Sequence, residues 1–261
     1  MQSIEDIRKQ QADKWWGSFL QQQAEISPEP RHFELLQFLR GGEEASILDV
    51  GCGPGHFLIL CRRHGFKNLA GFDESETAAQ AVRRQGITCT VGDIANPDDI
   101  DLERRFGFVV LADVLEHIFA PQRALRNVRR ILSDGGHLLV SVPNAGWLPA
   151  GLFNTFCPKL SGLSPAFGSW THCNQFTLYS LQVLLNSSGF TIAAVGGIKH
   201  DFSTYFSKNS LKARLGNLLL RVLFGTTNLF AKQWPAVFSP HLVVKARRDD
   251  IGRSDDDYWD R

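Results

Sequence analysis

A short strand-turn-helix segment constrains this chain more than any other stretch of its sequence. Residues 47–50 (Ile-Leu-Asp-Val) form a β-prone run, three glycines follow at Gly51, Gly53 and Gly55, and the apolar stretch 57–61 suits a helix. Glycines allow positive φ and close approach to a ligand, and a helix start offers unpaired N–H groups and the positive end of a dipole. The turn is therefore predicted to hold an anionic part of a nucleotide-like cofactor.

The spacing of the glycines separates two classes of cofactor. The dinucleotide-binding fingerprint places its third glycine three residues after the second, where the helix packs on the strand. That position is His56 here, and the sequence has no Tyr-x-x-x-Lys pair. A nicotinamide-dependent oxidoreductase is therefore disfavoured, although it stays an alternative hypothesis.

An acidic residue ends the next predicted strand, residues 68–73. Asp73, with Glu74 beside it, lies about 20 residues beyond the glycine turn, where a doubly wound sheet places a carboxylate against ribose hydroxyls. The alternative is an N-cap for the helix predicted over 76–85, but Ser75 suits that role by itself. We therefore predict that Asp73 binds a ribose.

Strands and helices continue to alternate along the chain. Residues 106–113 are a continuous apolar run, typical of a strand buried on both faces of a parallel sheet. Pro121 opens an amphipathic helix that residues 134–136 (Asp-Gly-Gly) are predicted to end; its apolar face carries Leu125, Val128, Ile131 and Leu132. The predicted strands are 47–50, 68–73, 86–91, 106–113, 137–142, 190–197 and 241–246, and helices are predicted over 177–188 and, in short form, within 95–105. This order predicts an α/β fold with a doubly wound, mostly parallel seven-stranded sheet.

The rest of the chain flanks this domain, which covers residues 46–247. Residues 1–45 are predicted to form an N-terminal helical cap, in which the adjacent Trp15 and Trp16 favour a packing role over a ligand contact. Residues 145–174 form a long loop whose aromatic content favours a lid over disorder. An amphipathic insertion is predicted over 199–240 and a mobile tail over 248–261.

Residues 208–238 have an apolar face at helical spacing with basic residues elsewhere. A basic amphipathic segment can lie in a membrane interface, and the predicted partners therefore include a peripheral membrane contact. The segment can equally pack on the protein as core or dimer surface. The sequence indicates no oligomeric state.

Bulk properties exclude several other classes. The net charge of +1 gives no reason to expect nucleic acid as a partner, and five cysteines without metal-ligand spacing are predicted to be free thiols. The first residues lack the apolar core of a signal peptide, and no run of 18 apolar residues is present. The cytoplasm is the predicted compartment.

Five motifs occur in the order found in class I S-adenosylmethionine-dependent methyltransferases, and residues 46–247 resemble that superfamily. They are the glycine turn, Asp73, Asp93, the strand leading into 113–117, and Gly135-Gly136. Within the superfamily the chain looks like the ubiquinone-biosynthesis O-methyltransferases, with which it shares ADKWW (12–16), DVLEHI (113–118), SVPN (141–144) and Thr171-His172. It departs from them at Asp113, where that group has Glu, and over residues 200–238.

The resemblance implies S-adenosyl-L-methionine as the cofactor. Asp93 would accept a hydrogen bond from the adenine amino group, the Ile94 N–H would meet a ring nitrogen, and Arg31 sits where that group carries a cofactor-binding arginine. The predicted cofactor-binding residues are Arg31, Asp49, Gly51, Cys52, Gly53, Gly55, Asp73, Glu74, Asp93, Ile94 and Ala112.

The predicted function is transfer of a methyl group to a small acceptor, aromatic or lipophilic, at oxygen. A phenolic nucleophile benefits from a base with a pKa near neutrality, and His117 and His172 qualify by location. Asp113, Glu116 and His117 could imitate the metal-associated Glu-x-x-Glu-His cluster of the resembling group, but no metal is predicted. The alternatives are the oxidoreductase and a non-catalytic binding protein with this fold.

Overall fold

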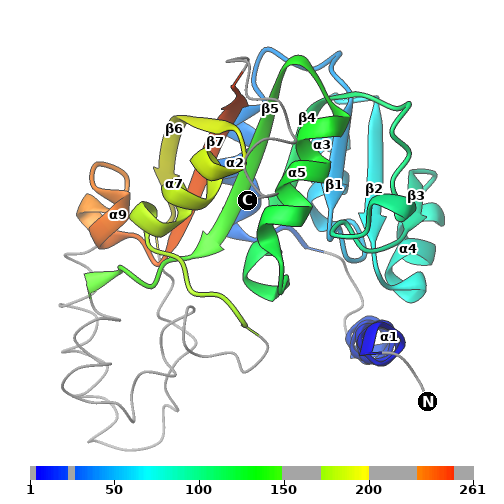
Figure 1. Ribbon diagram of the computed structural model, residues 1–261. Helices are drawn as coiled ribbons and strands as arrows, with labels where there is room; N and C mark the ends of the chain where they lie inside the picture. The colour runs from blue at the N-terminus through cyan, green and yellow to red at the C-terminus, as the bar shows by residue number, and fades with distance from the viewer. Residues whose placement is uncertain (1–3, 23–26, 149–171, 200–227, 250–261) are drawn as a thin grey trace, which may run out of the picture.

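The protein is organised around a seven-stranded β-sheet in the order β3-β2-β1-β4-β5-β7-β6 (Figure 1). The computed structural model describes residues 4–22, 27–148, 172–199 and 228–249. The strands are β1 (Ile47–Val50), β2 (Leu69–Asp73), β3 (Thr88–Val91), β4 (Phe106–Ala112), β5 (Leu132–Pro143), β6 (Phe190–Gly197) and β7 (His241–Arg248). β7 runs antiparallel to β5 and β6, whereas the pairs among β1 to β5 are parallel. The predicted doubly wound, mostly parallel sheet is confirmed.

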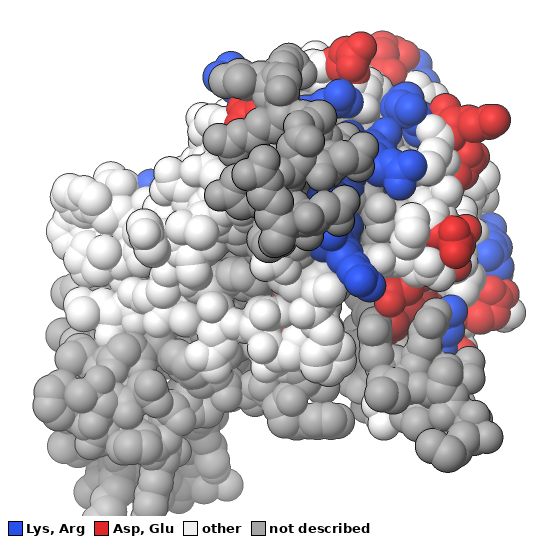
Figure 2. Space-filling view, in the orientation of Figure 1, with Lys and Arg blue, Asp and Glu red and all other residues white. Residues whose placement is uncertain are grey.

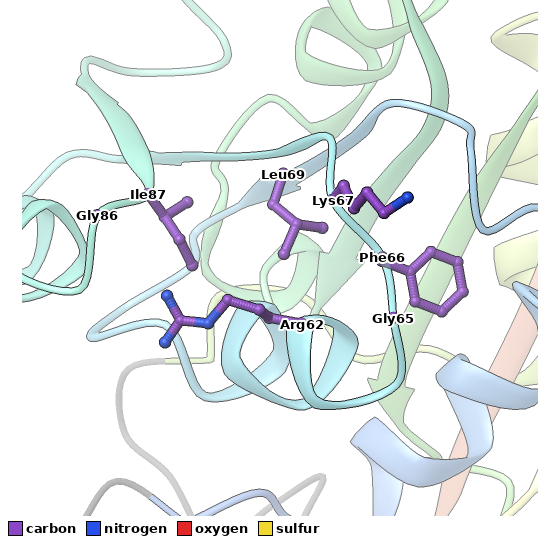
Figure 3. A pocket seen from close by; sticks show the side chains of 7 residues that line it. All are labelled: Arg62, Gly65, Phe66, Lys67, Leu69, Gly86 and Ile87. Carbon is purple, nitrogen blue, oxygen red and sulfur yellow. The ribbon is translucent and has the colours of Figure 1, made fainter.

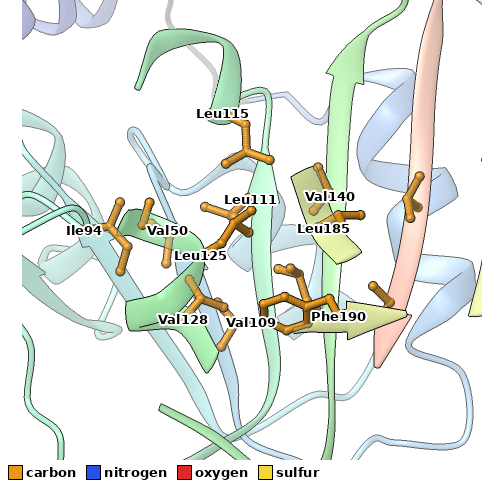
Figure 4. Close-up of a cluster of buried hydrophobic side chains, with 14 of the residues drawn as sticks. Val50, Ile94, Val109, Leu111, Leu115, Leu125, Val128, Val140, Leu185 and Phe190 are labelled. Atoms are coloured by element: carbon orange, nitrogen blue, oxygen red, sulfur yellow. The ribbon is translucent and has the colours of Figure 1, made fainter. Parts of the chain in front are cut away.

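Helices cover both faces of the sheet. α5 (Pro121–Ile131) and α7 (Leu178–Ser187) lie in front in Figure 1, and α2 (Pro30–Phe38), α3 (His56–Arg63) and α4 (Glu76–Arg83) pack on the opposite face. Successive residues of a strand point to opposite faces. In β4, Val109 and Leu111 pack with side chains of α5 (Figure 4), whereas Phe108 and Val110 pack with those of α2 and α3. β4 is therefore buried on both faces, as its continuous apolar run predicts.

The strand order reverses between β1 and β4. The chain runs outward from β1 through β2 to β3 and then returns to place β4 on the other side of β1. A doubly wound sheet binds its ligands at such a point, beyond the carboxyl ends of the strands. The glycine turn follows β1 and Asp113 follows β4, so the fold places both at this edge.

One predicted boundary is wrong. The helix opened by Pro121 ends at Ile131, and Leu132 with residues 134–136 belongs to β5 instead of to the helix and its stop. Leu132 pairs with Phe106, and the register with β4 then shifts before Phe108 pairs with His137. Gly135, at φ +73°, lies in this irregular stretch. Leu132 is buried in either arrangement, so its apolar character could not distinguish helix from strand.

The flanking segments are described only in part. Residues 1–45, for which the sequence predicts a helical cap, contain the helices α1 (Ile4–Gln22) and α2. The short 3₁₀ helix η1 (Pro97–Asp99) lies within the range predicted for a short helix. Of the lid predicted over 145–174, residues 149–171 lie outside the described residues. The same holds for 200–227 of the predicted insertion, for 250–261 of the predicted tail, and for Cys157. Among the described residues, cysteines 52, 61, 89 and 173 are thiols that form no disulfide bond, as predicted.

The described part of the predicted membrane-contacting segment is short. It contains α9 (Pro235–Phe238), and Leu229, Phe230 and Trp234 there are exposed. Across the described ranges, the structure contains no helix with the length and apolarity needed to span a bilayer. Figure 2 shows positive and negative side chains interspersed over the half that carries α4 and α5, while the half around α7 and α9 is mostly uncharged.

The packing of α5 leads to a stability prediction. Leu125 is 0% exposed in the core of Figure 4, so Leu125→Ala should lower the free energy of unfolding by about 2–5 kcal/mol. Val183 on α7 is 50% exposed, and Val183→Ala should change it by no more than about 0.5 kcal/mol. Urea denaturation measures both values. Equal losses in the two variants would contradict the assignment of Leu125 to the core.

Candidate cofactor and active site

The turn after β1 takes a conformation that requires its glycines. Gly51, Gly53 and Gly55 have φ values of +66°, +50° and +93°. A Cβ at Gly51 would lie 2.5 Å from a methyl carbon of Val114, so a side chain is excluded there by space as well as by φ. Within the turn, the Gly51 and Cys52 N–H groups donate to the Phe72 carbonyl, and the Gly55 N–H donates to the Cys52 carbonyl. The donors that can meet a carboxylate or phosphate are therefore the amides of the first turn of α3.

Asp73 closes this turn from the tip of β2. Its Oδ2 accepts a hydrogen bond from the Gly53 N–H (2.8 Å) and its Oδ1 accepts from the Ser75 N–H (2.9 Å). Ser75 itself is the N-cap of α4, accepting from the Ala78 N–H (3.2 Å). The cap is therefore supplied by Ser75. Burial raises the pKa of Asp73 to about 6, even though the Ser75 and Gly53 amides favour the ionised form.

The residues after β3 form a tight, hydrogen-bonded bend. The Asp93 carboxylate accepts from the Ala95 N–H (2.8 Å), and the Asp93 N–H donates to Asp99 (2.8 Å). The side-chain amide of Asn127, on α5, donates to the Ile94 carbonyl (2.9 Å). This bend lies at the same edge of the sheet as Asp73, because β2 and β3 are parallel neighbours.

Asp113, directly after β4, carries a buried charge. Ser141 donates to its Oδ1 (2.6 Å), and Arg31 Nε (3.2 Å) and His241 Nε2 (3.3 Å) form ion pairs with its Oδ2. Burial opposes ionisation, but His241 and Arg31 lower the pKa of Asp113 well below its usual range. Its φ of +56° is uncommon outside glycine and is more often accepted by Asp than by most residues.

The two histidines predicted to be catalytic lie side by side. His117 ends the 3₁₀ helix η2 (Leu115–His117), and its ring centroid is 4.8 Å from that of His172 in an edge-to-face arrangement. The backbone holds the two segments together, because the N–H groups of Cys173 (2.9 Å) and Asn174 (3.1 Å) both donate to the Glu116 carbonyl. Nδ1 of His172 is buried and has no hydrogen-bond partner among the described residues.

Glu116 adds a carboxyl group to this pair. Its side chain is buried, and neither oxygen has a hydrogen-bond partner within the described ranges. Burial and the nearby charge of Asp113 raise the pKa of Glu116 well above its usual value. A buried polar group without a partner costs stability, so its retention points to a functional role.

Asp113, Glu116 and His117, which could imitate the metal-associated cluster of the resembling group, do not form one cluster in the structure. Asp113 pairs with Arg31 and His241. Instead, one ligand atom each of Glu116, His117 and His172 lie within 4.8 Å of one another and could hold a metal ion. A carboxylate oxygen and two imidazole nitrogens are donors that zinc accepts. This donor set includes His172, which the sequence did not single out as a ligand.

The remaining predicted cofactor residues lie in β1, in the turn or at the tips of the neighbouring strands. Asp49 is buried in β1, where burial and the charge of Asp73 raise its pKa. Cys52 is also buried, with its Sγ 3.7 Å from that of Cys89. Ala112 ends β4, and Glu74 directly follows Asp73. Arg31 pairs with Glu29 as well as with Asp113, which brings it to the tip of β4.

Three residues at this edge were not predicted to be part of the site. His241 begins β7 and faces Asp113 across the sheet, a long-range contact that has no local sequence signal. Asp13 and Trp16 reach α4 and the glycine turn from α1. Both belong to the shared ADKWW motif, in which the sequence favours a packing role for the tryptophans and indicates no role for Asp13.

A separate cavity lies at the opposite end of the strands (Figure 3). Its volume is about 370 Å³, and it is lined by Arg62, Gly65, Phe66, Lys67, Leu69, Gly86 and Ile87. Leu69 is the first residue of β2, whereas Asp73 is the last. None of the predicted site residues lines this cavity, so it is not the candidate site.

Comparison with known proteins agrees with this geometry. A family model described as a methyltransferase domain matches residues 18–195. The ubiquinone biosynthesis O-methyltransferase of Alkalilimnicola ehrlichii is 31% identical over 147 residues, which cover 51% of this chain and 56% of that protein. The chain spans about half the length of the curated relatives it matches.

Two solved structures have a similar fold. An S-adenosylmethionine-dependent methyltransferase from Archaeoglobus fulgidus matches with a TM-score of 0.56 and 16% identity, covering 84% of this chain and 91% of that one. Magnesium protoporphyrin IX methyltransferase from Synechocystis PCC 6803, solved with bound SAH, matches with a TM-score of 0.51 and 17% identity, covering 84% and 81%. At these identities the likeness concerns the fold.

The pKa of Asp73 leads to a prediction about binding. If ribose hydroxyls donate to its ionised carboxylate, the competent fraction falls as the pH drops through about 6. The Kd for S-adenosylhomocysteine should therefore rise about tenfold between pH 7.5 and pH 5, as titration calorimetry can measure. Asp73→Asn should bind weakly at both pH values, whereas Glu103→Gln, at an exposed acid, should keep the wild-type profile. Wild-type affinity in Asp73→Asn would show that this carboxylate does not hold the ligand.

Proposed function

Because the chain belongs to the methyltransferase domain family, we propose that it transfers the methyl group of S-adenosylmethionine to a hydroxyl oxygen of a small aromatic or lipophilic acceptor. The observation that carries the choice of oxygen is the pairing of His117 with His172 at the edge where the cofactor residues gather. The name of the ubiquinone biosynthesis O-methyltransferase relative supports the same choice.

Cofactor binding falls to the glycine turn and the strand tips. The amides of the first turn of α3 and the Arg31 guanidinium suit the amino-acid portion, and Asp73 suits the ribose hydroxyls. The donor's positive sulfur supplies an activated methyl group, so the protein needs mainly to orient the acceptor. Orientation alone can contribute roughly 7–11 kcal/mol to a rate enhancement.

A hydroxyl acceptor must also lose its proton. In the proposed site, a histidine accepts this proton, and we assign the role to Nδ1 of His172, which has no hydrogen-bond partner in the described part of the chain. The ring of His117 lies edge-to-face against that of His172 and helps to hold it. A neutral amine is already nucleophilic and needs no base during the transfer, whereas a hydroxyl does, so the histidine pair favours oxygen as the nucleophile.

The alternative functions are not favoured. His56, where a dinucleotide fingerprint would need glycine, is the first residue of α3, and its ring lies near those of Phe19 and His32. A nicotinamide-dependent oxidoreductase is therefore not favoured, because the chain lacks the glycine that allows close packing of helix and strand in that fingerprint. A non-catalytic role does not explain the unpartnered polar atoms of Glu116 and His172.

The histidine assignment predicts the behaviour of two variants. His117→Ala and His172→Ala should each lower kcat for a phenolic acceptor, and loss of the base in His172→Ala should cost roughly 10²- to 10⁴-fold. Raising the pH toward the pKa of the phenol should restore part of the rate, because the acceptor then ionises without help. The Kd for S-adenosylhomocysteine should stay unchanged, and His64→Ala, at an exposed histidine far from the site, serves as the control.

The measurement is transfer of a labelled methyl group to a panel of phenols and matched primary amines. Methylation of amines but not of phenols would refute the choice of oxygen. The assay is repeated with EDTA: a proton-accepting histidine predicts an unchanged rate. Loss of activity that zinc restores would instead assign Glu116, His117 and His172 to metal binding.

A further inference from the structure

The N-terminal helix α1 meets the rest of the protein at the edge where the cofactor residues gather. In Figure 1 it lies beyond the ends of the strands, next to α4. Its contacts come from Asp13 and Trp16, two members of the ADKWW motif. This motif has no part in the function proposed above, so its contacts require a separate explanation.

Asp13 fastens α1 to the first turn of α4. Its Oδ1 accepts hydrogen bonds from the Ser75 hydroxyl (2.5 Å) and from the Thr77 N–H (3.0 Å). A carboxylate at a helix N-terminus is stabilised by the unpaired amides and the dipole found there. Ser75 in turn donates its own N–H to Asp73 (2.9 Å). One short chain of hydrogen bonds therefore joins Asp13 to the acid assigned to the ribose.

Trp16 reaches the glycine turn itself. A Cβ at Gly53 would lie 2.5 Å from Cη2 and 2.6 Å from Cζ2 of the Trp16 indole. The ring therefore lies against Gly53, the residue whose N–H donates to Asp73. Trp15, in contrast, is 58% exposed and stacks on Phe19 within α1. The two adjacent tryptophans thus occupy different environments, and only Trp16 faces the turn.

α1 has little else to hold it in place. Among its described side chains, residues 9–22, none is buried, so the helix has no apolar face packed into a core. In proteins, most of the stability of a helix comes from packing of such a face. A ligand that adds contact area beside Trp16 would therefore stabilise the docked position of α1.

We propose that the Trp16 indole is a wall of the cofactor site and that Asp13 is the positioning residue that holds it against the turn. Docking of α1 and binding of the cofactor then strengthen each other, since any such coupling is reciprocal. The proposal rests on the assignment of S-adenosylmethionine as the cofactor. It extends the site from the sheet edge to a segment more than thirty residues earlier in the chain.

Calorimetry with S-adenosylhomocysteine tests the wall. Trp16→Leu should raise the Kd by roughly 5- to 150-fold, the usual range of such couplings, and Asp13→Asn should raise it in the same direction. Trp15→Leu is the matched control and should stay within about twofold of wild type, well below that range. Thermal unfolding of the ligand-free variants should match wild type, because α1 contributes little to the core.

Limited proteolysis tests the reciprocal effect. Lys14 is exposed on α1, so trypsin should cleave there in the ligand-free protein, and S-adenosylhomocysteine should slow that cleavage. The protection should persist in Trp15→Leu and disappear in Trp16→Leu at a ligand concentration that saturates both. Unchanged protection in Trp16→Leu would overturn the coupling.

The outcomes separate this proposal from the function on which it rests. If the wild-type protein binds and Trp16→Leu binds equally well, the wall is wrong and the cofactor assignment stands. Tighter binding by Trp16→Leu would make the indole a competitor for the site and would also overturn the wall. If the wild-type protein shows no binding, the cofactor assignment itself fails.

Discussion

The buried charge of Asp113 is the interaction on which the arrangement of this site depends. Its carboxylate joins α2 through Arg31, β5 through Ser141 and β7 through His241, three segments that are far apart in the sequence. Removing one partner from a buried ion pair leaves a charge uncompensated, which is strongly destabilising, typically by about 3–5 kcal/mol. Because Arg31, Ser141 and His241 occupy the Asp113 carboxylate, the cluster of Glu116, His117 and His172 does not include it.

Local sequence patterns were sufficient for most of the fold and for the parts of the site at strand tips. The glycine turn and Asp73 could be placed because a parallel sheet brings the ends of β1 and β2 to one edge, whatever the rest of the chain does. The helix boundary at Leu132 could not, since a buried leucine satisfies a helix face and a strand equally well. His241 could not either, because its partner is brought to it only by the position of β7 in the sheet.

The histidine pair shows a different limit of sequence-based inference. The sequence indicates His117 and His172 as catalytic candidates separately, His117 by its place near the sheet edge and His172 by its place at the loop. Their contact is made by backbone hydrogen bonds from residues 173 and 174 to the Glu116 carbonyl, which do not depend on side-chain identity. Such bonds leave no mark in a sequence. Likewise, Trp15 and Trp16 are chemically identical and adjacent, and only the structure shows that the Trp16 ring lies against Gly53 whereas Trp15 is exposed.

The position of β7 affects the order in which the molecule can be completed. β7 follows β6 in the chain but pairs between β5 and β6, so β6 has no place in the sheet until residues 241–248 have been synthesised. During translation, one edge of β5 and the whole of β6 therefore stay unpaired until β7 emerges. This agrees with the general behaviour of domains, which fold as units once their chain is available. Because β7 also brings His241 to Asp113, a ribosome-bound chain without β7 would leave the Asp113 carboxylate without this partner.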